Sequence, residues 1–217
     1  MKKHTLLLAV AGLSALVMLV ACDALIFPPD DFEPSGTPFN LNPQIDVLSI
    51  AGKDAGFPNS GTYPLNFEAE TGGAGPEHDT LPPGLLFRSK SNQVQHMLML
   101  KPHPVAVGTK SDDIELGVFC CNEFRHIPRS NDSFELGPVS DNAELMEIAS
   151  LVDGKDMSGA LWTVQRAVWM VTDSTGLNQV YRDSLAALPD ETYGSRSGFY
   201  RYDRALLERM KREWRGH

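Results

Sequence analysis

The hydrophobic periodicity of this chain changes near Pro138, and this change constrains the fold more than any other feature. Before it, apolar residues recur at every second position, as in Tyr63, Leu65 and Phe67, which predicts strands with one buried face. After it, apolar residues recur at helical spacing, first in the segment 145–152. Strands followed by helices are typical of an α+β fold. We therefore expect a β-sandwich or barrel-like N-terminal half packed against a C-terminal helical half.

The expected strands lie between residues 45 and 136 and are separated by turn-forming residues. The candidate strands are 63–68, 94–100, 105–107 and 114–119. The stretch 71–83 is rich in glycine and proline, which predicts a mobile loop. The expected helices are about 141–152, opened by a capping box of Asp141 and Glu144, then 159–172, 177–188 and 203–214.

The N-terminus has the three parts of an export signal. Lys2 and Lys3 are followed by an apolar run over 6–20 and by small residues before Cys22. The run is shorter than the roughly 20 residues that a membrane-spanning helix prefers. An uncleaved helical anchor is the alternative interpretation.

The end of this segment, Leu19-Val20-Ala21-Cys22, resembles the lipobox of bacterial lipoproteins. The resemblance implies that residues 1–21 are a lipoprotein signal peptide and that Cys22 carries acyl chains. Two or three such chains anchor a protein firmly to a membrane. We therefore expect a cell-envelope protein, lipid-anchored on the outer side of the cytoplasmic membrane or in the outer membrane. Asp23 resembles the residue that retains enterobacterial lipoproteins in the inner membrane.

The mature chain is expected to have a tether and one domain. Residues 22–43 contain the lipidated cysteine and five prolines, which predicts a semi-rigid spacer. Residues 44–217 are expected to form a single globular domain, with about 44–139 rich in strands and 140–217 helical.

The charge of the chain excludes one class of partner. The formal net charge is −9, and removal of the signal with its two lysines makes it more negative by two units. Such an acidic surface repels phosphate groups, so we expect no nucleic-acid partner.

No motif of a conventional hydrolase, phosphate-binding loop or metalloenzyme occurs in the chain. His78, His96, His103 and His126 are scattered, without the spacing of a metal site. We expect a protein that is not an enzyme and has no metal or other cofactor.

Two segments together carry the most specific signal. Phe119-Cys120-Cys121-Asn122 ends a predicted strand, and the segment 163–169, Thr-Val-Gln-Arg-Ala-Val-Trp, lies in a predicted helix. Thr172-Asp173 follows shortly after. In this order the segments resemble the bacterial thioester domains of surface adhesins. Val164 stands where that family commonly has threonine, and Cys121 is not part of its pattern.

The resemblance implies an internal thioester between the Cys120 sulfur and the Gln165 side chain. Such a bond is attacked by amines, so the expected partner is an external protein or another amine-bearing surface. The supporting residues would be Phe119, Asn122, Trp162, Trp169 and Asp173. Helical spacing places the two tryptophans beside Gln165, where they would keep water out.

The same residues also allow purely structural interpretations. Cys120 and Cys121 would then form a vicinal disulfide or be free, with one or both thiols buried. Gln165 would cap a buried strand end, and the tryptophans would belong to the core. The protein would then be a structural or interaction lipoprotein without chemistry. A thiol redox role is disfavoured because nothing adjacent lowers a thiol pKa.

Overall fold

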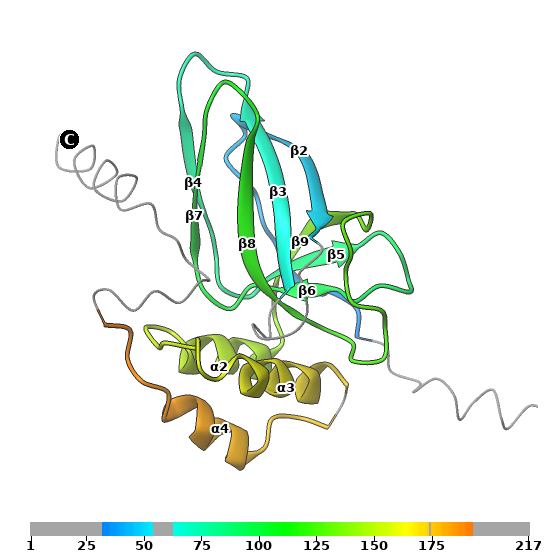
Figure 1. Ribbon diagram of the computed structural model, residues 1–217, viewed down its shortest axis with the longest axis vertical. Coiled ribbons are helices and arrows are strands. Elements are labelled where there is room, and N and C mark those ends of the chain that lie inside the picture. Colours follow the sequence, from blue (N-terminus) through cyan, green and yellow to red (C-terminus); the bar gives the residue numbers. More distant parts are fainter. Residues whose placement is uncertain (1–31, 54–62, 174, 193–217) are drawn as a thin grey trace, which may run out of the picture. The chain divides into compact units, whose positions relative to one another are not determined.

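The computed structural model describes residues 32–53, 63–173 and 175–192, which include most of the expected domain. The predicted signal peptide, Cys22 and the predicted helix 203–214 lie outside the described residues. The described part is an α+β fold, in which a strand-rich N-terminal half precedes three helices (Figure 1). The predicted fold class is therefore confirmed.

Seven strands form one antiparallel sheet in the spatial order β1-β9-β5-β6-β8-β3-β2. The strands are β1 (Gly36–Pro38), β2 (Ile45–Gly52), β3 (Tyr63–Thr71), β5 (Leu85–Ser89), β6 (Met97–Leu98), β8 (Asp112–Cys120) and β9 (Phe134–Ser140). A separate two-stranded sheet pairs β4 (Glu77–Leu81) with β7 (His103–Val107). β4 lies within the stretch expected to be a mobile loop, so that prediction is wrong for residues 77–81.

The two ends of the large sheet approach each other, as the barrel-like prediction requires. Ala51 of β2 forms an antiparallel bridge with Ser133, immediately before β9. The Gly52 N–H donates to the Asp132 carbonyl at 2.9 Å. A Cβ atom on Gly52 would lie 2.3 Å from the Arg129 carbonyl oxygen, so glycine permits this close approach.

Part of the predicted tether belongs to the sheet. Gly36–Pro38 pairs with β9, and Pro38 stands opposite Pro138. Proline cannot donate to a ladder, but it is tolerated on an edge strand such as β1. The expected boundary at residue 43 is therefore wrong for this segment.

The three helices are α2 (Ala143–Leu151), α3 (Leu161–Thr172) and α4 (Gln179–Ala186). Figure 1 shows α2 and α3 side by side below the strands, with α4 outside them. The side chain of Asn142, rather than Asp141, caps α2 by accepting hydrogen bonds from the N–H groups of Glu144 and Leu145. Each described helix begins two residues after the predicted start.

Strand β8 separates two hydrophobic clusters. Leu116, Val118 and Cys120 belong to the cluster inside the large sheet. Phe119 and Cys121 belong to the cluster formed with the helices. Successive side chains of a strand point to opposite faces, so the C-terminal end of β8 contributes to both cores.

Candidate functional site

The side chain of Gln165 in α3 contacts Cys120, the last residue of β8. The Cys120 N–H donates to Gln165 Oε1 at 2.8 Å, and Gln165 Nε2 donates to the Cys120 carbonyl at 2.7 Å. Both residues are buried, at 0% and 1% exposure. The structure thus brings together the two residues paired from the sequence, and their hydrogen bonds join the glutamine amide to the cysteine backbone.

Cys120 accepts this partner through its backbone. Backbone groups two residues apart on a strand point to the same edge, so the N–H and C=O groups of Cys120 face the same edge of β8 as those of Val118, which pairs with Tyr63 of β3. Buried backbone groups require partners, and a glutamine amide supplies one donor and one acceptor. Gln165 therefore takes the place of a neighbouring strand at this position.

The adjacent cysteines are both free thiols, and both are fully buried in separate clusters. Burial raises the pKa of Cys120 well above its usual value, and the neighbouring Cys121 raises it further. Burial also raises the pKa of Cys121, as does the charge of Asp173, while Arg125 opposes these effects. Both thiols are therefore protonated at neutral pH. Of the free-cysteine alternatives, the one with both thiols buried describes them.

The predicted apolar shell is only partly present. Trp169 is buried in the same cluster as Cys120, and its indole N–H donates to Gln95 Oε1 at 3.2 Å. Phe119 lies in the other cluster, so it does not close the face on which the Cys120 side chain lies. Trp162 is 62% exposed, which corrects the expectation that it is enclosed around Gln165.

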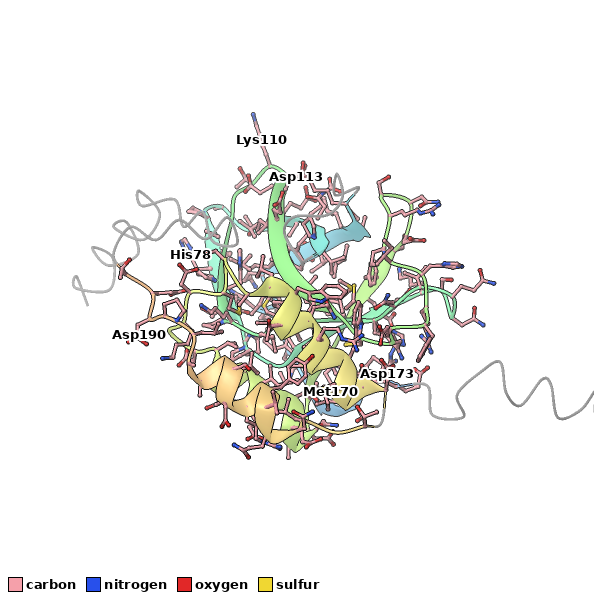
Figure 2. All side chains as sticks on the ribbon, turned by 60° about the horizontal axis from the view of Figure 1, so that its bottom comes forward. His78, Lys110, Asp113, Met170, Asp173 and Asp190 are labelled. Atoms are coloured by element: carbon pink, nitrogen blue, oxygen red, sulfur yellow. The ribbon has the colours of Figure 1, made fainter. Side chains whose placement is uncertain are left out.

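Asn122 and Asp173 join the loop after β8 to the end of α3. The Asn122 N–H donates to Thr172 Oγ1 at 3.3 Å, and the Glu123 N–H donates to Asp173 Oδ2 at the same distance. Asn122 adopts a φ of 65°, a conformation that asparagine tolerates better than most residues. Figure 2 shows Asp173 at the C-terminal end of α3, beyond Met170. These two predicted residues therefore hold the β8 end against α3.

A buried polar cluster beside this junction was not foreseen. Arg125 Nη2 lies 3.1 Å from Glu33 Oε1, and Arg125 Nη1 lies 2.9 Å from His96 Nε2. The Ser89 N–H donates to His96 Nδ1 at 3.0 Å. Gln95, which holds Trp169, also donates from Nε2 to the Arg125 carbonyl at 3.0 Å. No local sequence pattern predicts these contacts, because most of the partners are far apart in the sequence.

No group of three or more His, Cys, Asp or Glu side chains suited to a metal ion occurs in the described part of the chain. Glu77 and Asp79 of β4 accept hydrogen bonds from Asn42 at 3.1 and 2.7 Å. His78 lies between them on β4, away from Asp173 in Figure 2.

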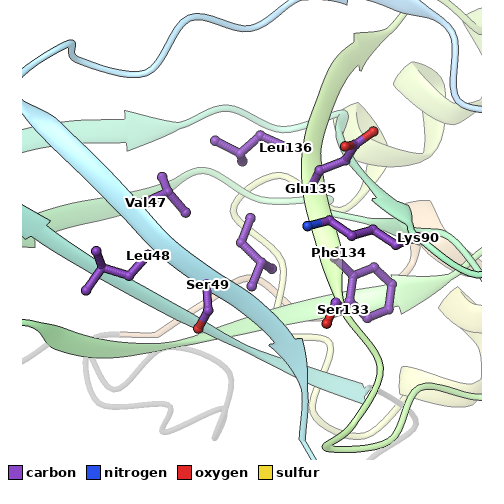
Figure 3. A pocket seen from close by; sticks show the side chains of 9 residues that line it. Val47, Leu48, Ser49, Lys90, Ser133, Phe134, Glu135 and Leu136 are labelled. Carbon is purple, nitrogen blue, oxygen red and sulfur yellow. The ribbon is translucent and has the colours of Figure 1, made fainter.

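A groove of about 470 Å³ opens between β2 and β9, where the two strands diverge from their contact at Ser133 (Figure 3). It is lined by Val47, Leu48, Ser49, Ile50, Lys90, Ser133, Phe134, Glu135 and Leu136. The groove shares no residue with the contact between Cys120 and Gln165.

None of the described helices combines the length and apolarity needed to cross a bilayer. Comparison of the chain with protein-family models, curated proteins and solved structures found no match.

Proposed function

We propose that this protein is a lipid-anchored envelope protein in which Cys120 and Gln165 form an internal thioester for covalent attachment to an external amine-bearing partner. The observation that carries the proposal is the pair of hydrogen bonds between the Gln165 amide and the backbone of Cys120. The glutamine singled out by the motif thus bonds to the backbone of the motif cysteine.

The hydrogen bonds are suited to acyl transfer. The Cys120 N–H bonds Gln165 Oε1 at 2.8 Å, where negative charge develops when a nucleophile attacks the amide carbon. The Cys120 carbonyl accepts from Nε2 at 2.7 Å and so orients the nitrogen that must leave. The Gln165 amide is held beside the Cys120 backbone by a helix and a strand that both contribute to the core.

The reaction exchanges one bond for another without an oxidant. The Cys120 sulfur attacks the Gln165 Cδ, the Cδ–Nε2 bond breaks, and ammonia leaves with the thiol proton. Because the thiol pKa is raised by burial, this proton is still present when attack begins. The same burial keeps water from the product, which would otherwise hydrolyse to a thiol and a glutamate.

The anchor part of the proposal depends on the sequence of residues 1–22. The positive start, the apolar run and the small residues before Cys22 support export and lipid attachment. A Cys22→Ala variant should leave the membrane fraction, whereas Cys121→Ala should remain there. Retention of Cys22→Ala in the membrane would refute the lipid anchor.

An intact mass measurement tests the thioester. The protein is purified from membranes in mild detergent without reductant and compared with its Cys120→Ala variant, which carries the same lipid. After correction for the substitution, the unsubstituted protein should be lighter by one ammonia. Cys121→Ala should keep this deficit, and methylamine should abolish it while labelling Gln165. A deficit of two hydrogens, or no deficit, would refute the thioester.

The alternative is a structural or interaction lipoprotein with two free buried cysteines. The observation that favours it is that both polar atoms of the Gln165 amide are already satisfied by the Cys120 backbone. In that case Gln165 only caps the strand, and the mass equals the value calculated for two free thiols.

A further inference from the structure

Only one of the helix neighbours of Gln165 is open to solvent. On a helix, side chains three and four positions apart lie beside each other. For Gln165 these neighbours are Leu161, Trp162, Val168 and Trp169, with exposures of 6%, 62%, 0% and 8%. On α3, the solvent side of the Gln165 amide is therefore the side of Trp162.

The two tryptophans meet beside Gln165. Their ring centroids are 5.6 Å apart, and the rings are nearly perpendicular at 85°. A helical side chain leans toward the N-terminus of its helix, so Trp169 covers the turn that contains Gln165. The pair lies on the flank of α3 that carries Gln165, and we call it the tryptophan wall.

The two halves of the tryptophan wall differ in how firmly they are held. Trp169 is buried with Cys120 in one cluster, and its indole is bonded to Gln95. Gln95 is fixed in turn by bonds to the Arg125 carbonyl and, through its own N–H, to the His126 carbonyl. Trp162 lies mostly in solvent and packs edge-on against Trp169. Rotation of Trp162 would open the wall without disturbing the core.

We propose that Trp162 is the gate of the Cys120–Gln165 bond and sets the width of the nucleophile that reaches it. This inference rests on the proposed thioester. With Trp162 in place, a slender unbranched primary amine reaches the Gln165 Cδ, whereas an amine branched next to nitrogen is excluded. The amine nitrogen bonds to Cδ, the Cδ–sulfur bond breaks, and the leaving Cys120 sulfur takes up the proton that the amine loses and becomes a thiol. The closed wall also slows hydrolysis.

The test measures amine selectivity in the full-length protein purified from membranes in mild detergent. Methylamine and tert-butylamine are added separately, and mass gain is followed with time for the unsubstituted protein, Trp162→Ala and Trp162→Phe. Val180→Ala is the matched control, because Val180 is an exposed apolar residue, at 71%, on a different helix. Circular dichroism verifies that each variant is folded.

Trp162→Ala should react with tert-butylamine about tenfold faster or more, equivalent to about 1.4 kcal/mol. Its methylamine rate should change much less, Trp162→Phe should retain most of the discrimination, and Val180→Ala should behave as the unsubstituted protein. If the unsubstituted protein shows the ammonia deficit but Trp162→Ala has the same amine selectivity, Trp162 is not a gate, although the thioester exists. Absence of the deficit in the unsubstituted protein would overturn both.

Discussion

A glutamate at position 165 should make the stability of this protein depend on pH in a defined direction. Gln165 Nε2 donates to the Cys120 carbonyl at 2.7 Å, and only a protonated carboxyl can supply a donor in its place. The site is also buried, which disfavours the ionised form. In Gln165→Glu, the folded-state pKa of the new carboxyl should therefore rise above the unfolded value of about 4.3.

The sign and size follow from proton binding. The folded state holds the proton more tightly than the unfolded state, so the stability due to the protonated carboxyl is complete below about pH 4.3. It is lost as the pH rises through the folded-state pKa, at about 1.4 kcal/mol per pH unit. A buried carboxyl with a folded-state pKa above about 7 should cost Gln165→Glu about 2.5 kcal/mol between roughly pH 5 and 7.

The assay is urea unfolding followed by circular dichroism at the two pH values. Both the glutamine and the glutamate forms carry Cys120→Ala, so that no thioester can form and the Cys120 backbone groups remain. The difference in free energy of unfolding between the two forms cancels the pH dependence of all other groups. An equal difference at both pH values would show that Gln165 does not donate to the Cys120 carbonyl, and the basis of the candidate site would fall.

Three further perturbations test other parts of the fold. Asn142→Ala should lower the free energy of unfolding by about 1 kcal/mol, because it removes the α2 cap, and urea unfolding should show a smaller loss for Asn142→Asp. Burial lowers the pKa of His103 to about 4, so the unfolded state binds a proton first as the pH falls below 6.5. The contribution of His103 to the free energy of unfolding should therefore decline by about 1.4 kcal/mol per pH unit as the pH falls toward 4. Urea unfolding of His103→Gln should show a weaker decline of the free energy of unfolding over the same pH range. Gly52→Ala should lower the melting temperature because its Cβ would lie 2.3 Å from the Arg129 carbonyl oxygen, whereas Gly75→Ala, which has no atom within 4 Å of the added Cβ, should not.

The sequence predicted strand burial better than strand pairing. The whole segment 94–100 is buried, as its apolar character on both faces indicated. Only Met97 and Leu98 join the sheet ladder, between β5 and β8. Hydrophobic periodicity reports which side chains avoid water, but pairing depends on which segments of the chain arrive beside one another.

The prolines near the N-terminus misled the prediction of the domain boundary for a related reason. A proline-rich composition is typical of tethers, yet Pro38 is compatible with a strand because β1 lies at the sheet edge. Whether a segment can pair with an exposed sheet edge depends on the folded sheet. Amino-acid composition alone therefore does not predict such pairing.

At the site, the pairing of Cys120 with Gln165 was foreseen from a motif, but the form of their contact was not. The contact arises because the N–H and C=O groups of Cys120 meet the Gln165 amide of α3, which bonds both of them. Gln95 accepts a hydrogen bond from the Trp169 indole, and Thr172 accepts one from the Asn122 N–H. Neither interaction was predicted from the sequence. Their partners are 74 and 50 residues away, beyond the reach of any local pattern.

The geometry of β8 distinguishes the two cysteines. The Cys120 backbone faces Gln165, whereas the Cys121 N–H donates to the His96 carbonyl at 2.8 Å, on the opposite edge of the strand. Their side chains likewise belong to different clusters. A vicinal disulfide needs both sulfur atoms on the same side, so it would require the end of β8 to unfold locally. A mass deficit of two hydrogens would therefore contradict the strand itself, while an ammonia deficit that survives Cys121→Ala would agree with the position of Gln165 beside Cys120.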